Sequence, residues 1–372
     1  MDVKERVLTA LRGGTPDRVP VTAQWNEGFA TMVAETDWRR FRAGWDYWRA
    51  LCEAHWRLGT DAFQTWGEPV EFDVHWEDGW GDWEQTLEHG YDYWIVERKI
   101  ETPLGNLRSR VKRTPLTNWR LKDLVEGPED WRIYKAYMEE WLRLAEPNVE
   151  RYDAAVDEIG DRGVLTFHLN AAWDHLGNQR GFENMIADTF RYPDLVKELI
   201  EVAGKVMMKR LDFFNECKGE VLQFVPYYAA YASPKIFKDW ELQDLHAVMN
   251  KVDKDRVVGV YLCGPMKHFL PYLVEAGVDY VEDFPPASMG GDITLGEAKK
   301  KYGRQICLLG GFNILLLPDG TPDQIRAEAK RCMDEAKEGG GYVFGTTDQV
   351  PYDATVENVK LMVEAAMKHA PY

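Results

Sequence analysis

Side chains with acid–base or metal-binding capacity recur at one kind of place in the C-terminal third of this sequence, directly after a short apolar run. Four runs end in this way: Cys263 follows residues 257–262, Glu282 and Asp283 follow 278–281, Asn313 follows 306–309, and Asp348 follows 342–344. A carboxyl group can act as a general acid or base, and a thiolate is a good ligand for zinc. These residues are therefore candidates for catalysis or metal binding.

Two runs nearer the N-terminus end in the same way: His168 and Asn170 follow residues 163–167, and Gln24 and Trp25 follow 19–23. Tyr261, two residues before Cys263, is a further candidate as a hydrogen-bond donor or weak ligand. Imidazole, thiolate and carboxylate groups together suit a transition metal. We therefore expect a mixed metal site from these residues: His168, Cys263, Glu282 and Asp348.

The apolar runs indicate how these side chains are positioned. Polar residues do not alternate within the runs, which is typical of strands buried on both faces, and helix-like segments between them imply parallel strands. Four successive strand–helix units between Val257 and Asp348 indicate a (β/α) barrel or a doubly wound sheet. In a barrel, all the polar strand ends converge on one mouth. Glu282 and Asp283 are adjacent, so alternation predicts that one faces this mouth and the other points outward.

The N-terminal third has a different composition, because 12 of the 15 tryptophans lie before Arg132. Residues 93–111 alternate in polarity around Pro103-Leu104-Gly105 and predict a β-hairpin that interrupts the barrel. No linker-like tract is present, so we expect one domain over residues 1–372, with an N-terminal cap at roughly 26–135. The loop tryptophans either pack this cap onto the barrel or line an aromatic mouth: Trp66, Trp76, Trp80 and Trp83.

Composition narrows the classes of partner. The net charge of −17 argues against nucleic acid or an anionic membrane, because both need clustered Lys and Arg. Five scattered cysteines do not form a disulfide framework, which favours a reducing cytoplasm. Residues 1–6 are charged and lack an apolar signal core, and no run reaches membrane-spanning length.

Several segments spread over nearly the whole chain resemble the uroporphyrinogen decarboxylase superfamily, and within it the branch similar to corrinoid-dependent methyltransferases. They are Lys4-Glu5-Arg6-Val7-Leu8, Leu11-Arg12-Gly13, Pro16-Asp17-Arg18-Val19-Pro20-Val21, Thr102-Pro103-Leu104-Gly105, Leu262-Cys263-Gly264, Pro285-Pro286, Gly291-Asp292, Gly310-Gly311-Phe312-Asn313 and Glu357-Asn358-Val359. The resemblance implies an α/β protein, a (β/α)8 TIM-like barrel with N-terminal helices and the inserted β-hairpin as cap. Its active cleft would lie at the carboxyl ends of the strands.

The resemblance implies two activities, and this sequence departs from the pattern of each. The decarboxylases carry an Arg-Gln-Ala-Gly-Arg segment after the first strand, because a polyanionic porphyrinogen needs guanidinium groups. Residues 22–28 here contain no arginine, which argues against uroporphyrinogen as substrate. Many of the methyltransferases hold zinc with a His-x-Cys pair and a later cysteine. Here Tyr261 stands in place of the histidine, and no cysteine occurs near 346–348, so zinc at Cys263 would need other ligands.

The leading hypothesis is a cytoplasmic methyltransferase that moves a methyl group between a small O- or N-methylated compound, such as a methoxylated aromatic, and a corrinoid (cobalamin) on a separate corrinoid protein. The expected catalytic residues are Glu282, His168, Tyr261 and Asp348. The expected substrate contacts are Gln24, Trp25, Asn170 and Asn313, and a homodimer is one expected assembly. Two alternatives stay open: a decarboxylase-like lyase acting on a smaller acid, and a catalytically inert barrel that binds a corrinoid or a partner.

Overall fold

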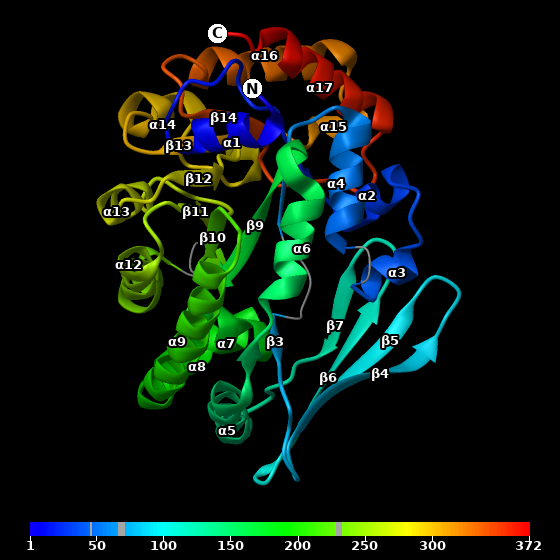
Figure 1. The fold of residues 1–372 in the computed structure, drawn as a ribbon, viewed down its shortest axis with the longest axis vertical. Helices are drawn as coiled ribbons and strands as arrows, with labels where there is room; N and C mark the ends of the chain where they lie inside the picture. Colours follow the sequence, from blue (N-terminus) through cyan, green and yellow to red (C-terminus); the bar gives the residue numbers. More distant parts are fainter. Residues whose placement is uncertain (45–46, 66–70, 228–232) are drawn as a thin grey trace.

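A sheet of seven parallel strands forms the centre of the protein, and helices surround it (Figure 1). The computed structural model describes residues 1–44, 47–65, 71–227 and 233–372. In spatial order the seven strands are β14 (Tyr342–Thr346), β13 (Cys307–Phe312), β12 (Tyr280–Asp283), β11 (Val257–Tyr261), β10 (Val221–Val225), β9 (Gly163–Asn170) and β2 (Ala62–Thr65). All the neighbouring pairs are parallel, as the unalternated apolar runs predict.

The segment 19–25 closes this sheet into a barrel. Val21 forms a parallel bridge with Phe344 of β14, and its carbonyl accepts a hydrogen bond from the Asp61 amide, next to β2, at 2.7 Å. The chain continues as β1 (Gln24–Trp25), which pairs with β15 (Gln349–Val350). The strand predicted at 19–23 is thus present as a short bridging segment, because Pro20 has no amide hydrogen to extend the ladder.

Asp61 anchors the closing segment. Its buried carboxylate accepts hydrogen bonds from Arg18 at 2.6 and 2.9 Å, from Arg6 at 3.0 Å and from the Val21 amide at 2.8 Å. Arg6 also pairs with Asp17 at 2.7 and 2.8 Å. The N-terminal motif that carries part of the family resemblance therefore serves barrel closure.

Helix α1 (Val3–Leu11) covers the amino ends of the strands, where its Val7 and Leu11 belong to one buried cluster with Val257 and Val343. The other helices are α2 (Glu27–Val33), α3 (Trp38–Arg42), α4 (Tyr47–Leu58), α5 (Pro128–Leu144), α6 (Val149–Ile159), α7 (Ala172–Arg180), α8 (Phe182–Arg191), α9 (Pro193–Glu216), α11 (Pro234–Ile236), α12 (Leu242–Lys251), α13 (Leu270–Ala276), α14 (Leu295–Tyr302), α15 (Leu316–Asp319), α16 (Pro322–Ala336) and α17 (Val356–His369). None of the helices in the described ranges combines the length and the apolar content that crossing a bilayer requires.

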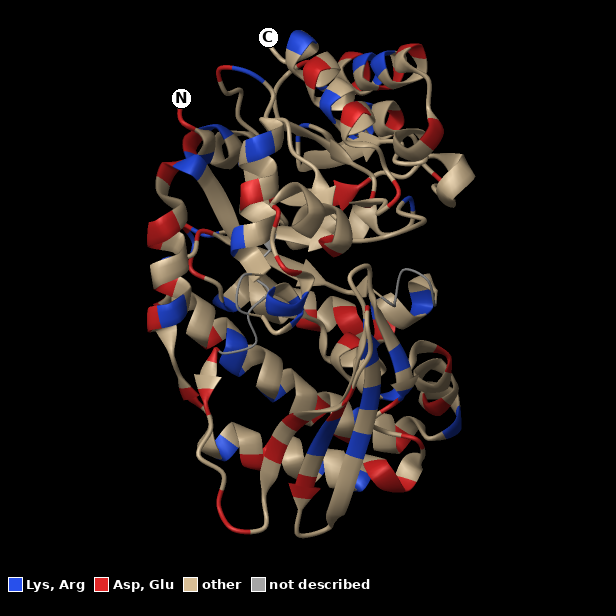
Figure 2. Cartoon of the chain, turned by 90° about the vertical axis from the view of Figure 1, so that its right-hand side faces the viewer, with Lys and Arg blue, Asp and Glu red and all other residues tan. Residues whose placement is uncertain are grey.

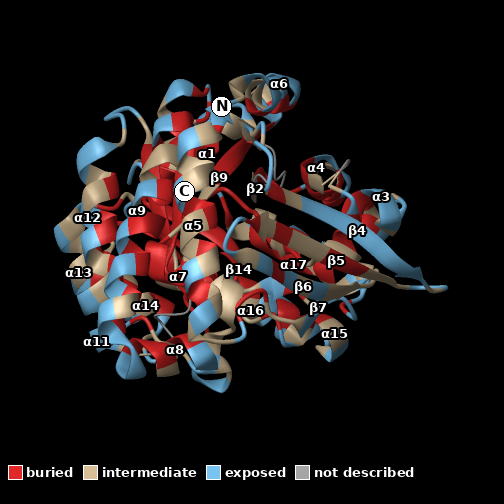
Figure 3. Cartoon of the chain, turned by 90° about the horizontal axis from the view of Figure 1, so that it is seen from below, coloured by how far each residue is buried: buried red, intermediate tan, exposed pale blue. Residues whose placement is uncertain are grey.

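The cap contains more strands than the predicted hairpin. It is an antiparallel sheet of four strands in sequential order: β4 (Gly81–His89), β5 (Trp94–Thr102), β6 (Gly105–Arg113) and β7 (Asn118–Lys122). Strand β4 escaped prediction because it is exposed along nearly its whole length and shows no alternation of polarity (Figure 3). A short pair, β3 (Phe72–Asp73) with β8 (Glu146–Pro147), lies at the base of the cap.

The cap shares its core with the barrel. Ile100 and Leu107 of the cap sheet belong to the same buried cluster as Phe167 of β9. Lysines and arginines recur along the cap strands (Figure 2), and several are paired with acidic residues of neighbouring strands, such as Arg98 with Asp82. The sheet therefore forms one wall over the carboxyl ends of the barrel strands.

Candidate active site

A cavity of about 160 Å³ lies at the carboxyl ends of the barrel strands. Its lining includes five of the residues singled out from the sequence: Gln24, Trp25, His168, Tyr261 and Glu282. Its lining also includes four polar residues that the sequence analysis did not select: Tyr47, Gln64, Gln223 and Gln349. The signal for Gln64 and Gln223 was present, because each interrupts an apolar strand that is otherwise buried. A polar side chain inside such a strand points either into the barrel or toward its helices.

Glu282 and Asp283 both face the interior, so the predicted alternation of these two side chains is wrong. Gln24 Nε2 lies 2.5 Å from Glu282 Oε1 and 3.3 Å from Asp283 Oδ1, and it donates to both. Asp283 and Phe284 have φ values of 112° and 56°, a region that residues other than glycine rarely adopt. This twist at the end of β12 brings two consecutive carboxyl groups to one side of the chain.

Gly310 makes room for the twisted backbone. It also has a positive φ, 114°, and a Cβ atom at this position would lie 2.4 Å from the carbonyl oxygen of Asp283. Only glycine allows β13 to approach β12 this closely without strain. Gly310 therefore supports the position of the acidic pair.

Burial and mutual repulsion keep the acidic pair protonated at higher pH than ordinary carboxyl groups. Burial, with a smaller contribution from Asp348, raises the pKa of Glu282 to about 7, although the hydrogen bonds from Gln24 and Gln223 lower it. Burial, followed by Glu282 and Asp348, raises the pKa of Asp283 well above its ordinary value. Two buried carboxyl groups that share one amide donor cannot both ionise without large cost. The pair therefore retains a proton near neutral pH and can donate it.

Cys263 lies beside this pair. Its thiol donates to Asp283 Oδ2 at 3.1 Å, and its sulfur lies 2.8 Å from the hydroxyl oxygen of Tyr261. Burial and the neighbouring carboxyl groups raise the pKa of the thiol, which disfavours the thiolate that zinc requires. Within the described ranges, no three His, Cys, Asp or Glu side chains are grouped so as to hold a metal ion. The mixed metal site predicted from His168, Cys263, Glu282 and Asp348 and zinc at Cys263 therefore stay predictions.

Three buried polar atoms around the cavity have no hydrogen-bond partner within the described part of the chain: Trp25 Nε1, Gln64 Oε1 and His168 Nε2. Burial lowers the pKa of His168 to about 4, with a smaller contribution from Arg210, so its imidazole is neutral at pH 7. Buried polar groups without partners are costly, and they are expected where a ligand satisfies them. The indole N–H of Trp25 and the amide oxygen of Gln64 are thus available to bind a ligand beside the acidic pair.

The remaining candidates lie outside this cavity. Asn313 caps the turn into α15, where its side chain accepts a hydrogen bond from the Leu315 amide at 3.1 Å. Asp348 accepts from the Gln349 amide at 2.6 Å, yet it acts on the acidic pair through its charge. Asn170 ends β9 in register with Val225 and does not line the cavity. Their predicted roles as substrate contacts or catalytic residues stay predictions.

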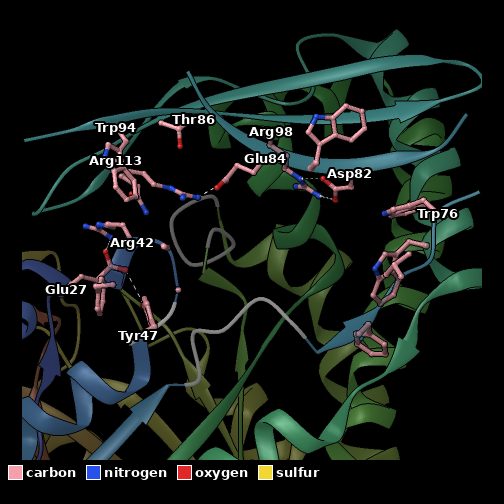
Figure 4. A pocket seen from close by; sticks show the side chains of 18 of the residues that line it. Glu27, Arg42, Tyr47, Trp76, Asp82, Glu84, Thr86, Trp94, Arg98 and Arg113 are labelled. Carbon is pink, nitrogen blue, oxygen red and sulfur yellow. Dashed lines mark hydrogen bonds and ion pairs between the residues drawn. The ribbon is translucent and has the colours of Figure 1, made fainter. Parts of the chain in front are cut away.

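A second and much larger cavity of about 900 Å³ lies between the cap sheet and residues of the helices α2, α3, α4 and α5 (Figure 4). Trp76 and Trp83 line it, together with Trp94, Tyr137 and Trp141. Of the other two loop tryptophans, Trp80 is not in its lining, and Trp66 lies outside the described residues. Trp76 stacks on Tyr137 of α5, with ring centroids 5.4 Å apart, and also faces the cavity. The two interpretations of the loop tryptophans stay predictions.

Comparison with known proteins agrees with this architecture. Residues 128–369 match the family model described as uroporphyrinogen decarboxylase (URO-D). The chain belongs to the URO-D family. Within the family it is 23% identical to the uroporphyrinogen decarboxylase of Neisseria meningitidis serogroup C over 218 residues, which cover 57% of this chain and 59% of that protein.

Members of the URO-D family with a different activity are equally similar. The methylated-thiol–coenzyme M methyltransferase of Methanosarcina mazei is 23% identical over 220 residues, which cover 57% of this chain and 56% of that protein. The chain thus spans less than two thirds of the length of the curated relatives it matches. A solved structure of a methyltransferase from Methanosarcina mazei superposes over 99% of both chains with a TM-score of 0.65 at 16% identity, which confirms the TIM-like barrel fold.

Proposed function

We propose that this protein is a methyltransferase that moves a methyl group between a small O- or N-methylated compound and a corrinoid carried by a separate protein. The observation that carries the proposal is the protonated acidic pair in a small cavity beside unpartnered polar groups. The methyltransferase relatives support the reaction class. The corrinoid is here a substrate, and it supplies the electron pair that accepts the methyl group.

The acidic pair supplies the proton that the departing group needs. As the bond between the methyl carbon and oxygen breaks, its electron pair stays on oxygen, and Glu282 transfers a proton to that oxygen. Gln24 and Gln223 hold the carboxyl group in place through its two oxygens. Trp25 and His168 are placed to bind the polar part of the substrate through their unpartnered nitrogens. General acid catalysis of this kind contributes about 100- to 10,000-fold to a rate.

A lyase that acts on a smaller acid is the second candidate function. The decarboxylase relatives favour it, and so does a cationic residue, Arg42, in the large cavity. The third candidate, an inert barrel that binds a corrinoid or partner, predicts that no side chain at the mouth affects turnover. These candidates differ in products: methyl-corrinoid, carbon dioxide or none.

The proposed function is tested by incubating the protein with methoxylated and N-methylated compounds and a reduced corrinoid, with visible absorbance as the measure of methylation. Methylation that Glu282→Gln abolishes supports the methyltransferase. Release of carbon dioxide from a carboxylated compound, with no methylation of the corrinoid, would instead support the lyase. Elemental analysis of the wild type and of Cys263→Ala tests zinc separately, because the proton transfer described above does not depend on a metal.

A further inference from the structure

The large cavity has a cationic side chain whose hydrogen bonds are incomplete. Arg42, at the end of α3, is buried, with its side chain only 3% exposed. Its Nε donates to the carbonyl oxygen of Thr114 at 2.9 Å, and one terminal nitrogen pairs with Glu27. The other terminal nitrogen is buried and has no partner within the described ranges. A buried guanidinium group with an unmade hydrogen bond is costly, and an oxyanion would satisfy it.

The charges around Arg42 leave it as the available donor. The three carboxylates that line the cavity are each paired with an arginine: Glu27 with Arg42, Asp82 with Arg98, and Glu84 with Arg113. Arg98 uses two nitrogens on Asp82, at 2.9 and 2.7 Å. The lining charges therefore cancel in pairs, and the buried terminal nitrogen of Arg42 that has no partner in the described ranges can donate to an anion.

The walls of the cavity are aromatic. Figure 4 shows Arg42, Tyr47, Trp94 and Arg113 gathered at one end of the cavity, and Trp76 at the other. Flat apolar walls with a few fixed polar groups are the usual composition of small-molecule sites, and a volume of 900 Å³ is within their range. The arrangement suits a planar ligand that carries one negative group.

Tyr47 connects this cavity with the barrel mouth, because it lines both cavities. Its hydroxyl donates to Glu27 at 3.1 Å. A carboxylate cannot lie in the smaller cavity without repulsion from Glu282, Asp283 and Asp348. An acidic ligand that reaches both cavities must therefore place its carboxylate at Arg42 and its opposite end at the acidic pair.

We propose that the large cavity binds an aromatic carboxylate through Arg42, and that the methyl donor of the proposed reaction is such an aromatic acid, with its methyl group directed to the barrel mouth. The identity of the methyl donor rests on the proposed function. Binding of an aromatic carboxylate at Arg42 does not depend on that function.

The test is a titration with 4-methoxybenzoate as the probe, followed by calorimetry and without a corrinoid. The neutral analogue 4-methoxybenzamide should bind to the wild type on the order of 10- to 100-fold more weakly than the acid does. Arg42→Lys keeps the charge beside Glu27 but loses the planar guanidinium group, so it should bind 4-methoxybenzoate more weakly than the wild type by a similar factor. The double variant Arg42→Gln/Glu27→Gln, which leaves no unpaired buried charge, should lose binding as well. Arg132→Gln, at an exposed arginine, is the matched control and should bind as the wild type does.

Equal binding of the acid and the amide, or unchanged affinity in folded Arg42 variants, would overturn the proposal, and so would no binding by the wild type. Binding that depends on Arg42 but leads to no methylation of a corrinoid would keep the anion site and refute the proposed function. Glu282→Gln separates the two in one protein, because it should still bind 4-methoxybenzoate through Arg42 and should lose methyl transfer by about 100-fold or more.

Discussion

Gln24 and Glu282 are separated by 258 positions in the chain, and their side chains meet at the barrel mouth with Nε2 and Oε1 2.5 Å apart. The contact exists because the strand that closes the barrel comes first in the sequence and reaches across the mouth toward β12. The same amide reaches Asp283 at 3.3 Å. One uncharged donor thus serves two buried carboxyl groups. Its hydrogen bonds lower the pKa of both groups, but burial outweighs them and the pair retains a proton.

Replacing Glu282 by glutamine should reduce methyl transfer by about 100-fold or more, because the variant cannot supply the proton. The substitution preserves shape, so the circular dichroism spectrum should not change. Glu338→Gln, at an exposed glutamate, provides the matched control. Full activity in Glu282→Gln would remove this residue from the reaction.

The stability of the protein should depend on pH through Glu282. Its pKa is about 7 in the folded chain, against an ordinary value of 4.5. The folded chain holds a proton that the unfolded chain loses, so this stabilisation is complete below about pH 4.5 and is lost as the pH rises through 7. Glu282→Gln has no such group. The free energy of unfolding of Glu282→Gln, relative to that of the wild type, should therefore rise by about 3 kcal/mol between pH 4.5 and pH 8. This figure follows from the difference between the two pKa values at about 1.4 kcal/mol per pKa unit.

Urea unfolding of both proteins across this pH range measures the difference directly. A difference that stays constant with pH would mean that Glu282 ionises as an exposed glutamate does.

Gly310→Ala should destabilise the fold by about 3 kcal/mol or more, because the new methyl group meets the Asp283 carbonyl at 2.4 Å and the φ of 114° is strained for alanine. Gly204→Ala, in the middle of α9 with nothing within 4 Å of the added carbon, should instead stabilise the protein by about 0.5–1 kcal/mol. Thermal unfolding of the two variants distinguishes these opposite effects. Equal melting temperatures would contradict the account of the β12–β13 approach.

Asp61→Asn should cost about 3–5 kcal/mol, because Arg6 and Arg18 would lose the buried charge that pairs them. Glu158→Gln disrupts a half-exposed pair with Arg49 and should change stability by less than about 1 kcal/mol. Chemical denaturation of both variants provides the comparison. Similar small losses in the two would show that Asp61 does not anchor barrel closure.

Sequence patterns were sufficient for the barrel strands and insufficient for the geometry of the mouth. Buried strands such as β11 and β13 are apolar throughout, so their position and parallel pairing could be predicted. The inward orientation of Asp283 could not be predicted, because it depends on a positive φ that the residue type at this position does not indicate. Gln223 contacts Glu282 from the neighbouring part of the sheet, and only tertiary structure shows that they meet.

The cap also contains features that sequence patterns could not predict. Arg42 was not selected because it lies on a helix of the cap and not after a barrel strand, and its surroundings come from Glu27, Thr114 and the cap sheet. Similarly, the exposed strand β4 has no buried face whose period a sequence pattern could record. Sites built within an insertion are therefore harder to predict than sites built at the ends of barrel strands.

The way in which the barrel closes has a consequence for biosynthesis. The Gln24 amide bonds to Thr346, 322 positions later, so the opening segment finds its partners in β14 only after that strand has left the ribosome. Until then the opening segment presents an unpaired edge to its surroundings. Long loop closures of this kind are slow, and they expose apolar surface while they last. Nascent chains of this protein should therefore depend on chaperones until β14 has been synthesised.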